Sequence, residues 1–433
     1  MNRLFGLSLI YTLLSFWSIQ REGSVGIKRK KAKRKEKKES STPPKKKTEQ
    51  EMRRLKEKQQ SLNAKMVQNT VPPKGLAIVL LVVVLMGLII NVANGKSPDT
   101  HNVMALYVLG DSSVDCGDNT LLYPLTHHNF SLYPCDGSDS SLLPYLLAEK
   151  VRLPNILPFY SQNGSIAELQ HGLNFGSAEA TVLKPRSQSR QSLNQQLRQV
   201  FEIIQLLQLQ LGQNSADHFI KSSVVYLSFS KDDYIDLFLG NSSGVMLNYN
   251  SQEFAHILVN QMIHVIRILY NANFRKIICT GILPLGCTPR TVWKWYNTST
   301  VEKDGRGCVK EINDIVLEYN TMLNEHIVKL NSKLPDVQIV FCDVYQGIME
   351  IITKPENYGF KEVRNACCGA GTYGAMIGCL SQEMACDQAS SFVWWDLYNP
   401  TQAVNSLLAD SAWSGRPFSG MCHPITIQEL INT

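Results

Sequence analysis

Cysteine is absent from the first 100 residues of this 433-residue chain, and all eleven cysteines lie in the remainder. The absence excludes disulfides within the amino-terminal part. Four of the cysteines, Cys367, Cys368, Cys379 and Cys386, gather in a glycine-rich stretch, which favours disulfides formed in an oxidising compartment. A zinc site is the alternative, although the Cys-x2-Cys spacing typical of such sites is missing. Because eleven is odd, at least one thiol is free or paired outside the chain.

A basic excess is missing from most of the chain, even though its formal net charge is +6. Residues 1–75 hold 20 Lys and Arg against 6 Glu, which leaves a charge of −8 for residues 76–433. The body is therefore mildly acidic, and we expect no nucleic-acid partner for it. The basic run Lys28–Lys38 has no apolar face to bury, so residues 1–75 are predicted to be a disordered extension. A nuclear-localisation signal or an anionic-surface patch is the alternative interpretation.

Long apolar runs are rare, and two of them lie near the amino terminus. Residues 1–20 have the pattern of a signal peptide, with Arg3 before an apolar stretch. A second run, Leu76–Ile90, ends in Ala93-Asn94-Gly95, a small-x-small pattern suited to signal peptidase. We expect the functional unit to begin near Met66, with residues 76–95 as its signal peptide. The alternative is a signal anchor at residues 76–93, the one case in which the chain would be attached to a membrane.

Four Asn-x-Ser/Thr motifs follow this segment, at Asn129, Asn163, Asn241 and Asn297. Such motifs are glycosylated only in exported proteins. Together with the cysteines they favour a secreted body, residues 97–433, which shows neither an internal repeat nor a second domain. We expect this body to be a monomer.

The body alternates strand-length apolar runs with helical periodicity. Strands are predicted at residues 103–109, 223–229, 276–282 and 338–342. Apolar residues spaced at three and four predict amphipathic helices at 192–210, 251–271 and 309–330. This alternation is typical of an α/β fold in which helices cover both faces of a parallel sheet. The carboxyl ends of the strands are then the place to search for a site.

The first of these strands runs into Gly110-Asp111-Ser112-Ser113-Val114-Asp115. A strand that stops abruptly at Gly-Asp-Ser leaves one hydroxyl at the carboxyl edge of the sheet. Serine is a weak nucleophile until a base removes its proton. The chemistry of this chain therefore depends on the groups that surround Ser112.

Several separated blocks, in order, resemble the plant GDSL-type esterase/lipases of the SGNH hydrolase superfamily. The resemblance covers about residues 103–430, and its blocks are residues 110–119, 172–178, 231–235, 283–289, 343–345, 357–360, 366–371 and 395–401. It implies a flavodoxin-like three-layer α/β/α fold and a secreted enzyme that hydrolyses or transfers acyl esters of lipids without a cofactor. No metal site is implied.

The resemblance also assigns roles to individual residues. Ser112 stands at the position of the nucleophile and Asp396 at that of the acid that orients the base. The base should be a histidine three residues after this aspartate, where the chain has Asn399. An amide cannot accept the serine proton at neutral pH or return it to a leaving group.

Two oxyanion-stabilising positions are altered as well. Asp232 stands where the family offers an Asn side-chain donor, and a carboxylate repels developing negative charge. Glu179 stands where a glycine N–H is expected, and a shift of register would bring Gly176 there instead. We therefore predict an esterase whose catalysis is weak or lost. The alternative is a pseudoenzyme that binds lipid, a cell-wall ester or a protein partner.

Other side chains of the chain are candidates for the base in place of Asn399. The nine histidines are His101, His127, His128, His171, His218, His256, His264, His326 and His423, and three of them, His256, His264 and His326, fall within predicted helices. The adjacent Asp232 and Asp233, with Glu179 close by, are the other candidates, since clustered carboxylates can raise one pKa. The simpler interpretation is that Asp233 is structural and Asp232 replaces an Asn.

Overall fold

The predicted strands form the centre of the fold. The computed structural model describes residues 105–116, 142–154, 156–183, 191–240, 248–295 and 307–433, all within the compact unit Asp99–Thr433. Both amino-terminal apolar runs and the basic extension lie outside these residues. Of the acceptor motifs, Asn163 is described and is exposed, whereas Asn129, Asn241 and Asn297 lie outside the described residues.

One seven-stranded sheet organises the chain, in the order β2-β3-β1-β4-β5-β6-β9. All neighbouring strands pair in parallel except β9, which is antiparallel to β6. Their bounds are β1 Leu106–Gly110, β2 Leu157–Pro158, β3 Leu173–Asn174, β4 Val224–Ser228, β5 Lys276–Thr280, β6 Gln338–Cys342 and β9 Cys422–His423. The predicted parallel sheet is confirmed, and its antiparallel edge is an addition. A second sheet pairs β7 Glu362–Ala366 with β8 Phe392–Trp394.

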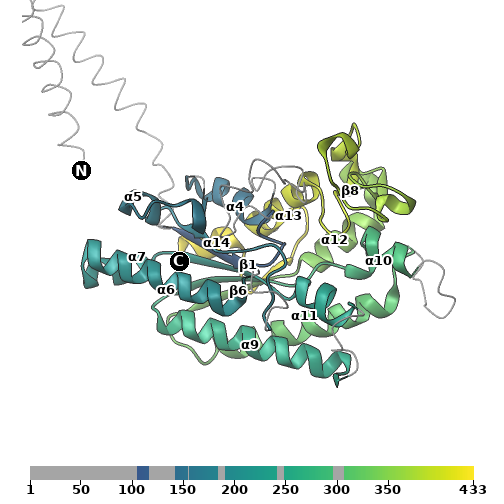
Figure 1. Ribbon diagram of the computed structural model, residues 1–433. Coiled ribbons are helices and arrows are strands. Elements are labelled where there is room, and N and C mark those ends of the chain that lie inside the picture. The colour runs from purple at the N-terminus through teal and green to yellow at the C-terminus, as the bar shows by residue number, and fades with distance from the viewer. Residues whose placement is uncertain (1–104, 117–141, 155, 184–190, 241–247, 296–306) are drawn as a thin grey trace, which may run out of the picture. The chain divides into compact units, whose positions relative to one another are not determined.

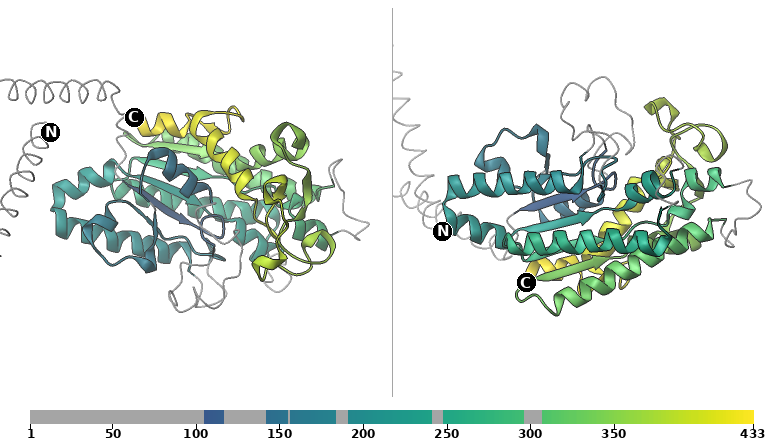
Figure 2. Two further views of the ribbon diagram at one scale, coloured as in Figure 1. Left: turned by 90° about the horizontal axis from the view of Figure 1, so that it is seen from above. Right: turned by 60° about the horizontal axis from the view of Figure 1, so that its bottom comes forward.

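Helices cover both faces of the large sheet, as expected of an α/β/α fold. On one face lie α6 Leu193–Leu211, α9 Ser251–Asn271 and α11 Lys310–Asn331; on the other lie α4 Leu143–Val151, α13 Gln402–Ser414 and α14 Ile427–Asn432 (Figures 1 and 2). The remaining helices are α5 Ile166–Leu169, α7 Gln213–Lys221, α10 Pro289–Lys294 and α12 Val344–Thr353, with η3 Asp233–Phe238 directly after β4. In the described part of the chain, no helix has the length and apolarity that crossing a bilayer requires.

The three predicted amphipathic helices are confirmed to within a residue at either end. Helices α6 and α9 each begin with a capping box, Ser192 with Gln195 and Asn250 with Glu253. Each box satisfies backbone N–H groups that a helix start would otherwise leave unpaired. Their apolar stripes face the sheet, so that β1 and β4 are completely buried.

Disulfides fasten the loops at the carboxyl side of the sheet. They join Cys287 to Cys308, Cys342 to Cys422, Cys367 to Cys386 and Cys368 to Cys379, and Cys116 is also disulfide-bonded. The zinc alternative for the cysteine cluster is therefore wrong. Cys279 is a free, buried thiol, as the odd number of cysteines requires.

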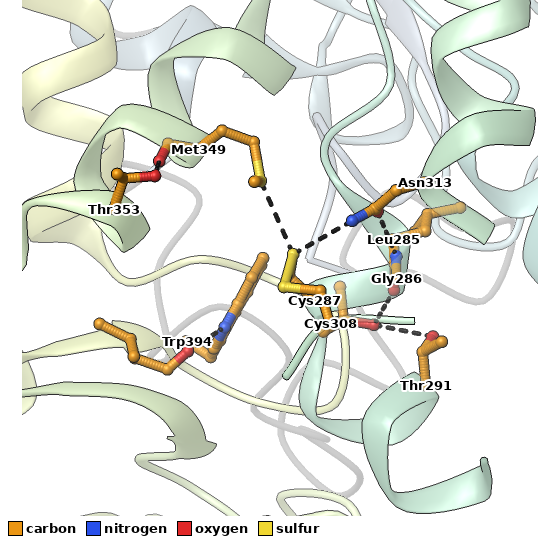
Figure 3. Close-up of a disulfide and its surroundings, with 11 residues drawn as sticks. Leu285, Gly286, Cys287, Thr291, Cys308, Asn313, Met349, Thr353 and Trp394 are labelled. Carbon is orange, nitrogen blue, oxygen red and sulfur yellow. Dashed lines mark hydrogen bonds between the residues drawn. A yellow bond between two sulfur atoms is a disulfide. The ribbon is translucent and has the colours of Figure 1, made fainter. Parts of the chain in front are cut away.

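The Cys287–Cys308 disulfide links the loop after β5 to the start of α11 (Figure 3). Asn313 holds this loop by two contacts: its amide nitrogen lies 3.3 Å from Cys287 Sγ, and its carbonyl oxygen accepts from the Gly286 N–H at 2.8 Å. Met349 Sδ lies 3.7 Å from the same sulfur (Figure 3). The fixed loop carries Leu283, which forms part of the cavity wall described below.

Candidate functional site

Strand β1 ends at Gly110 and brings Ser112 to the carboxyl edge of the sheet. Gln196 of α6 holds the strand end by accepting from the Gly110 N–H at 2.9 Å and donating to the Gly110 carbonyl at 2.8 Å. A Cβ at position 110 would lie 2.4 Å from the Val114 side chain and 2.6 Å from the Ser228 carbonyl oxygen. Only glycine therefore permits this turn beside β4.

The carboxylate of Asp232 occupies the space beside Ser112. Its Oδ1 accepts from the Ser112 hydroxyl at 2.6 Å, and its Oδ2 accepts from the Ser112 N–H at 2.9 Å. The Glu179 N–H donates to the same Oδ2 at 2.9 Å. Two backbone N–H groups thus converge on one oxygen, the arrangement that stabilises an oxyanion in acyl transfer. Here a side-chain carboxylate of the protein itself fills it.

Glu179 and Gly176 have different roles in this arrangement. Glu179 adopts a positive φ of 63°, which turns its N–H toward Asp232. The Gly176 N–H donates to Asn174 Oδ1 at 2.8 Å. The structure therefore places the Glu179 N–H beside Ser112, and a shift of register to Gly176 does not occur.

Two further carboxyl groups are buried next to Asp232. The Asp232 N–H donates to Asp111 Oδ2 at 3.2 Å, and burial together with the Asp232 charge raises the pKa of Asp111 to about 7. Burial raises the pKa of Asp233 to about 8, against the lowering effect of the Val182 and Leu183 N–H groups that it binds. Asp233 thus anchors the loop after β3 rather than contacting Ser112.

A second cluster lies in the loop after β8. Asp396 Oδ1 accepts from the N–H groups of Tyr398 at 2.9 Å and Asn399 at 2.8 Å, and Asp396 Oδ2 accepts from Asn399 Nδ2 at 3.0 Å. Lys231 Nζ in turn donates to Asn399 Oδ1 at 2.8 Å. Burial raises the pKa of Asp396, although these N–H donors and the Lys231 charge lower it. The cluster is a buried chain from carboxyl to amide to ammonium.

A cavity lined by residues of both clusters holds about 490 Å³ of empty space, a volume that includes its opening to solvent. Its polar end carries Ser112, Ser113, Lys231 and Asn399. Most of its exposed wall surface is apolar, with aliphatic side chains from Leu142, Leu143, Leu283, Val344, Ile348, Pro400 and Leu408, and Ser228, Thr280 and Asn405 add polar groups. A mostly apolar pocket with a few converging polar groups is typical of small-molecule sites.

No histidine lines this cavity among the residues that the structure describes. His256 and His264 lie on α9 and His326 on α11, as predicted. His423 Nε2 lies 2.9 Å from Asn324 Oδ1, at the β9 edge of the sheet. His101, His127 and His128 lie outside the described residues.

Comparison with known proteins fits this geometry. The sequence profile of the family described as GDSL-like lipase/acylhydrolase matches residues 106–412. The chain belongs to this family.

Its GDSL/SGNH fold is the mostly parallel sheet between helices described above. One GDSL esterase/lipase of Arabidopsis thaliana is 31% identical over 340 residues, which cover 76% of this chain and 89% of the relative. GDSL esterase/lipase 7 of the same plant is 28% identical over 370 residues, covering 82% of this chain and 98% of the relative.

The structure of this GDSL family member brings together the residues that sequence reasoning singled out, in two groups. Ser112, Glu179 and Asp232 meet at the ends of β1 and β4, whereas Asp396 and Asn399 meet after β8. Sequence reasoning missed Lys231, which connects the second group to the loop after β4. The signal that could have identified it was a charged side chain three residues after the end of the buried strand β4.

Proposed function

We propose that this GDSL family member binds a carboxylic ester or lipid in the cavity beside Ser112 and hydrolyses it weakly or not at all. The observation that carries the proposal is the position of the Asp232 carboxylate, which takes up both backbone N–H donors and the serine hydroxyl. A substrate carbonyl has no free donor there and would meet a negative charge. Loss of one oxyanion donor alone costs about 2.7–4 kcal/mol in the activation free energy.

The base position supports the same conclusion. Asn399 cannot accept the proton of Ser112, and its two polar atoms are engaged by Asp396 and Lys231. A triad that lacks its base retains only ~10³–10⁴-fold catalysis, from binding and the oxyanion hole. With that hole filled by Asp232, even this remainder should be small.

Asp232 itself is the strongest candidate for a substitute base, since it already accepts the serine hydroxyl. However, the same carboxylate bonds to the Ser112 and Glu179 N–H groups. If it took the proton and stayed in place, it would still exclude the substrate oxygen from these donors. Proton acceptance and oxyanion stabilisation therefore compete for one site, which argues against efficient hydrolysis.

The cavity walls favour an acyl chain as the ligand, because most of their exposed surface is apolar. The four described disulfides, the disulfide-bonded Cys116 and the exposed acceptor Asn163 suit export to an oxidising compartment, so we also propose a secreted, glycosylated protein. The secretion signal would lie in residues 76–95.

Two measurements on the full chain test the proposal. A fluorophosphonate probe should leave the wild type unlabelled, while the double variant Asp232→Asn, Asn399→His should be labelled at Ser112. Phenyl butyrate should raise the melting temperature of the wild type, since a ligand that binds only the folded state stabilises it. Leu283→Trp, which fills the cavity, should abolish that rise.

Labelling of the wild type that disappears in Ser112→Ala would overturn the loss of catalysis. Absence of a ligand-induced melting shift, across a series of phenyl esters of increasing chain length, would overturn ligand binding. The two results are independent, because labelling reports on Ser112 and the melting shift on the cavity.

A further inference from the structure

Lys231 stands at neither the nucleophile nor the base position, and it is a buried lysine. Only 2% of its surface is exposed, against 6% for Asp396 and 8% for Asn399. Burying an ammonium group is expensive unless partners compensate for the lost water. The three side chains form a continuous series in which Lys231 Nζ contacts Asn399 Oδ1 and Asn399 Nδ2 contacts Asp396 Oδ2.

We propose that Lys231 and Asn399 join in an intramolecular isopeptide bond, promoted by Asp396. The bond that forms links Lys231 Nζ to Asn399 Cγ, and the bond that breaks links this carbon to Nδ2. The products are a secondary amide and ammonia. No oxidant, reductant or cofactor takes part, since an ammonium and a carboxamide give an amide and an ammonium ion.

The distance between the reacting atoms supports this step. Lys231 Nζ lies 2.8 Å from Asn399 Oδ1. Because a C=O bond is about 1.23 Å long, Nζ is at most about 4.0 Å from Cγ, so a short further approach would bring it to the ~3–3.5 Å of a near-attack arrangement. The step requires Nζ to move from the amide oxygen to the face of the amide, while Asp396 holds the amide by Nδ2.

Asp396 is placed to move the protons. An amine must be neutral to attack, so the Lys231 ammonium first has to lose a proton to a nearby acceptor. Burial raises the pKa of Asp396, which favours proton uptake by its carboxylate. Asp396 Oδ2 lies 3.0 Å from Asn399 Nδ2, so the same carboxyl can return the proton to the departing nitrogen.

Burial also protects the reaction from water. Asn399 and Lys231 line the cavity with only 8% and 2% of their surface exposed, so that water reaches the amide less readily than the adjacent amine does. The new bond would join the loop after β4 to the loop after β8, across 168 residues of sequence. Two segments that meet at the cavity would then be joined covalently, and none of the described disulfides joins these two segments.

The mass of the reduced, denatured full chain tests the proposal directly. The expected mass is lower than that of the sequence by one ammonia, after allowance for processing and glycans. A protease digest should contain a branched peptide that joins the segments around Lys231 and Asn399. Lys276 provides an internal control, because it is also buried but donates to the backbone carbonyl of Ile431, which cannot form such a bond.

Variants assign the roles. Lys231→Arg and Asn399→Ala should give only linear peptides, and Asp396→Asn should slow bond formation at least ~10-fold, within the range for loss of an acid–base group. Asn399→Asp should form the same branched peptide by losing water instead. Circular dichroism checks that each variant is folded.

Complete absence of the branched peptide in the folded wild type, even after prolonged incubation at alkaline pH, would overturn the proposal. Bond formation at an unchanged rate in folded Asp396→Asn would overturn the role of Asp396. Neither result depends on probe labelling or ester binding, so this inference can fail while the proposed function stands.

Discussion

The two halves of the site differ from a catalytic serine-hydrolase arrangement in different ways. The nucleophile half, at the ends of β1 and β4, keeps the hydroxyl and both converging N–H groups but fills them with the Asp232 carboxylate. The base half, after β8, keeps the acid but has an amide where a proton acceptor is needed. Consecutive residues at the start of the helical segment after β4, Lys231 and Asp232, occupy the two halves. The first half is obstructed and the second is chemically incomplete, so different substitutions should repair them.

The largest expected effect comes from repairing both halves together. Asp232→Asn removes the charge beside Ser112 and supplies a donor, and Asn399→His supplies a base beside Asp396. We expect the double variant to hydrolyse p-nitrophenyl butyrate at least ~10³-fold faster than the wild type, and each single variant to gain much less, because triad members act as a unit. Steady-state kinetics checks this, with Ser112→Ala in the double variant as the control. A full gain from Asn399→His alone would show that Asp232 is no obstruction.

The second prediction concerns how much Lys231 contributes to the free energy of unfolding through the base half of the site. In the chain before the proposed isopeptide bond forms, Lys231→Met leaves Asn399 Oδ1 without the Lys231 donor and removes a cation that lowers the pKa of Asp111 and Asp396. We expect the free energy of unfolding to fall by about 2–4 kcal/mol. Urea denaturation measures it. A loss below ~1 kcal/mol would mean that the base half contributes little to stability.

The buried carboxyl groups of the nucleophile half should lower the free energy of unfolding as the pH rises from about 4 to about 8. Burial raises the pKa of Asp111 to about 7 and that of Asp233 to about 8, whereas an unfolded Asp has a pKa near 3.9. The folded state therefore holds more protons, so this stabilising contribution is complete below about pH 4 and is lost as pH rises through about 8.

Asp233→Asn tests this sign. The stability difference between the wild type and the variant should shift by a few kcal/mol in favour of the variant between pH 5 and pH 9. Urea midpoints at a series of pH values provide the measurement. A difference that stays constant with pH would contradict the raised pKa of Asp233.

The smallest effect is expected at the serine itself. Ser112→Ala removes one hydrogen bond to Asp232, but the carboxylate keeps its two backbone N–H donors. The unfolding free energy should change by less than ~1 kcal/mol. The same urea experiment decides this, and a larger loss would show that the hydroxyl is a structural element of the nucleophile half.

The sequence predicted those strands and helices that are long enough to show an apolar run or a helical periodicity within their own residues. Strands β1, β4, β5 and β6 are continuous apolar runs because both of their faces are buried. The strands β2, β3 and β9 have two residues each, too few for any periodicity. Their pairing depends on neighbours brought together by the rest of the fold.

The same distinction, between local sequence patterns and contacts with distant residues, holds for the site. The residues at its key positions could be named from ordered blocks of sequence. The directions in which the Asp232 and Lys231 side chains point could not be predicted from the sequence, because each direction is set by a partner distant in sequence. Asp232 contacts Ser112 across 120 residues, and Lys231 contacts Asn399 across 168. Adjacent charged residues at the start of one helix gave no sign that they would point into different halves.

The position of Asp232 has an evolutionary consequence. Aspartate and asparagine have nearly the same shape, so an exchange at this buried position changes charge and hydrogen-bond direction while leaving the surrounding packing in place. Selection for a stable fold would then act only weakly on the choice between them. On the proposed function, one exchange of a carboxylate for an amide at this position would therefore bear on hydrolysis more than on the packing of the fold.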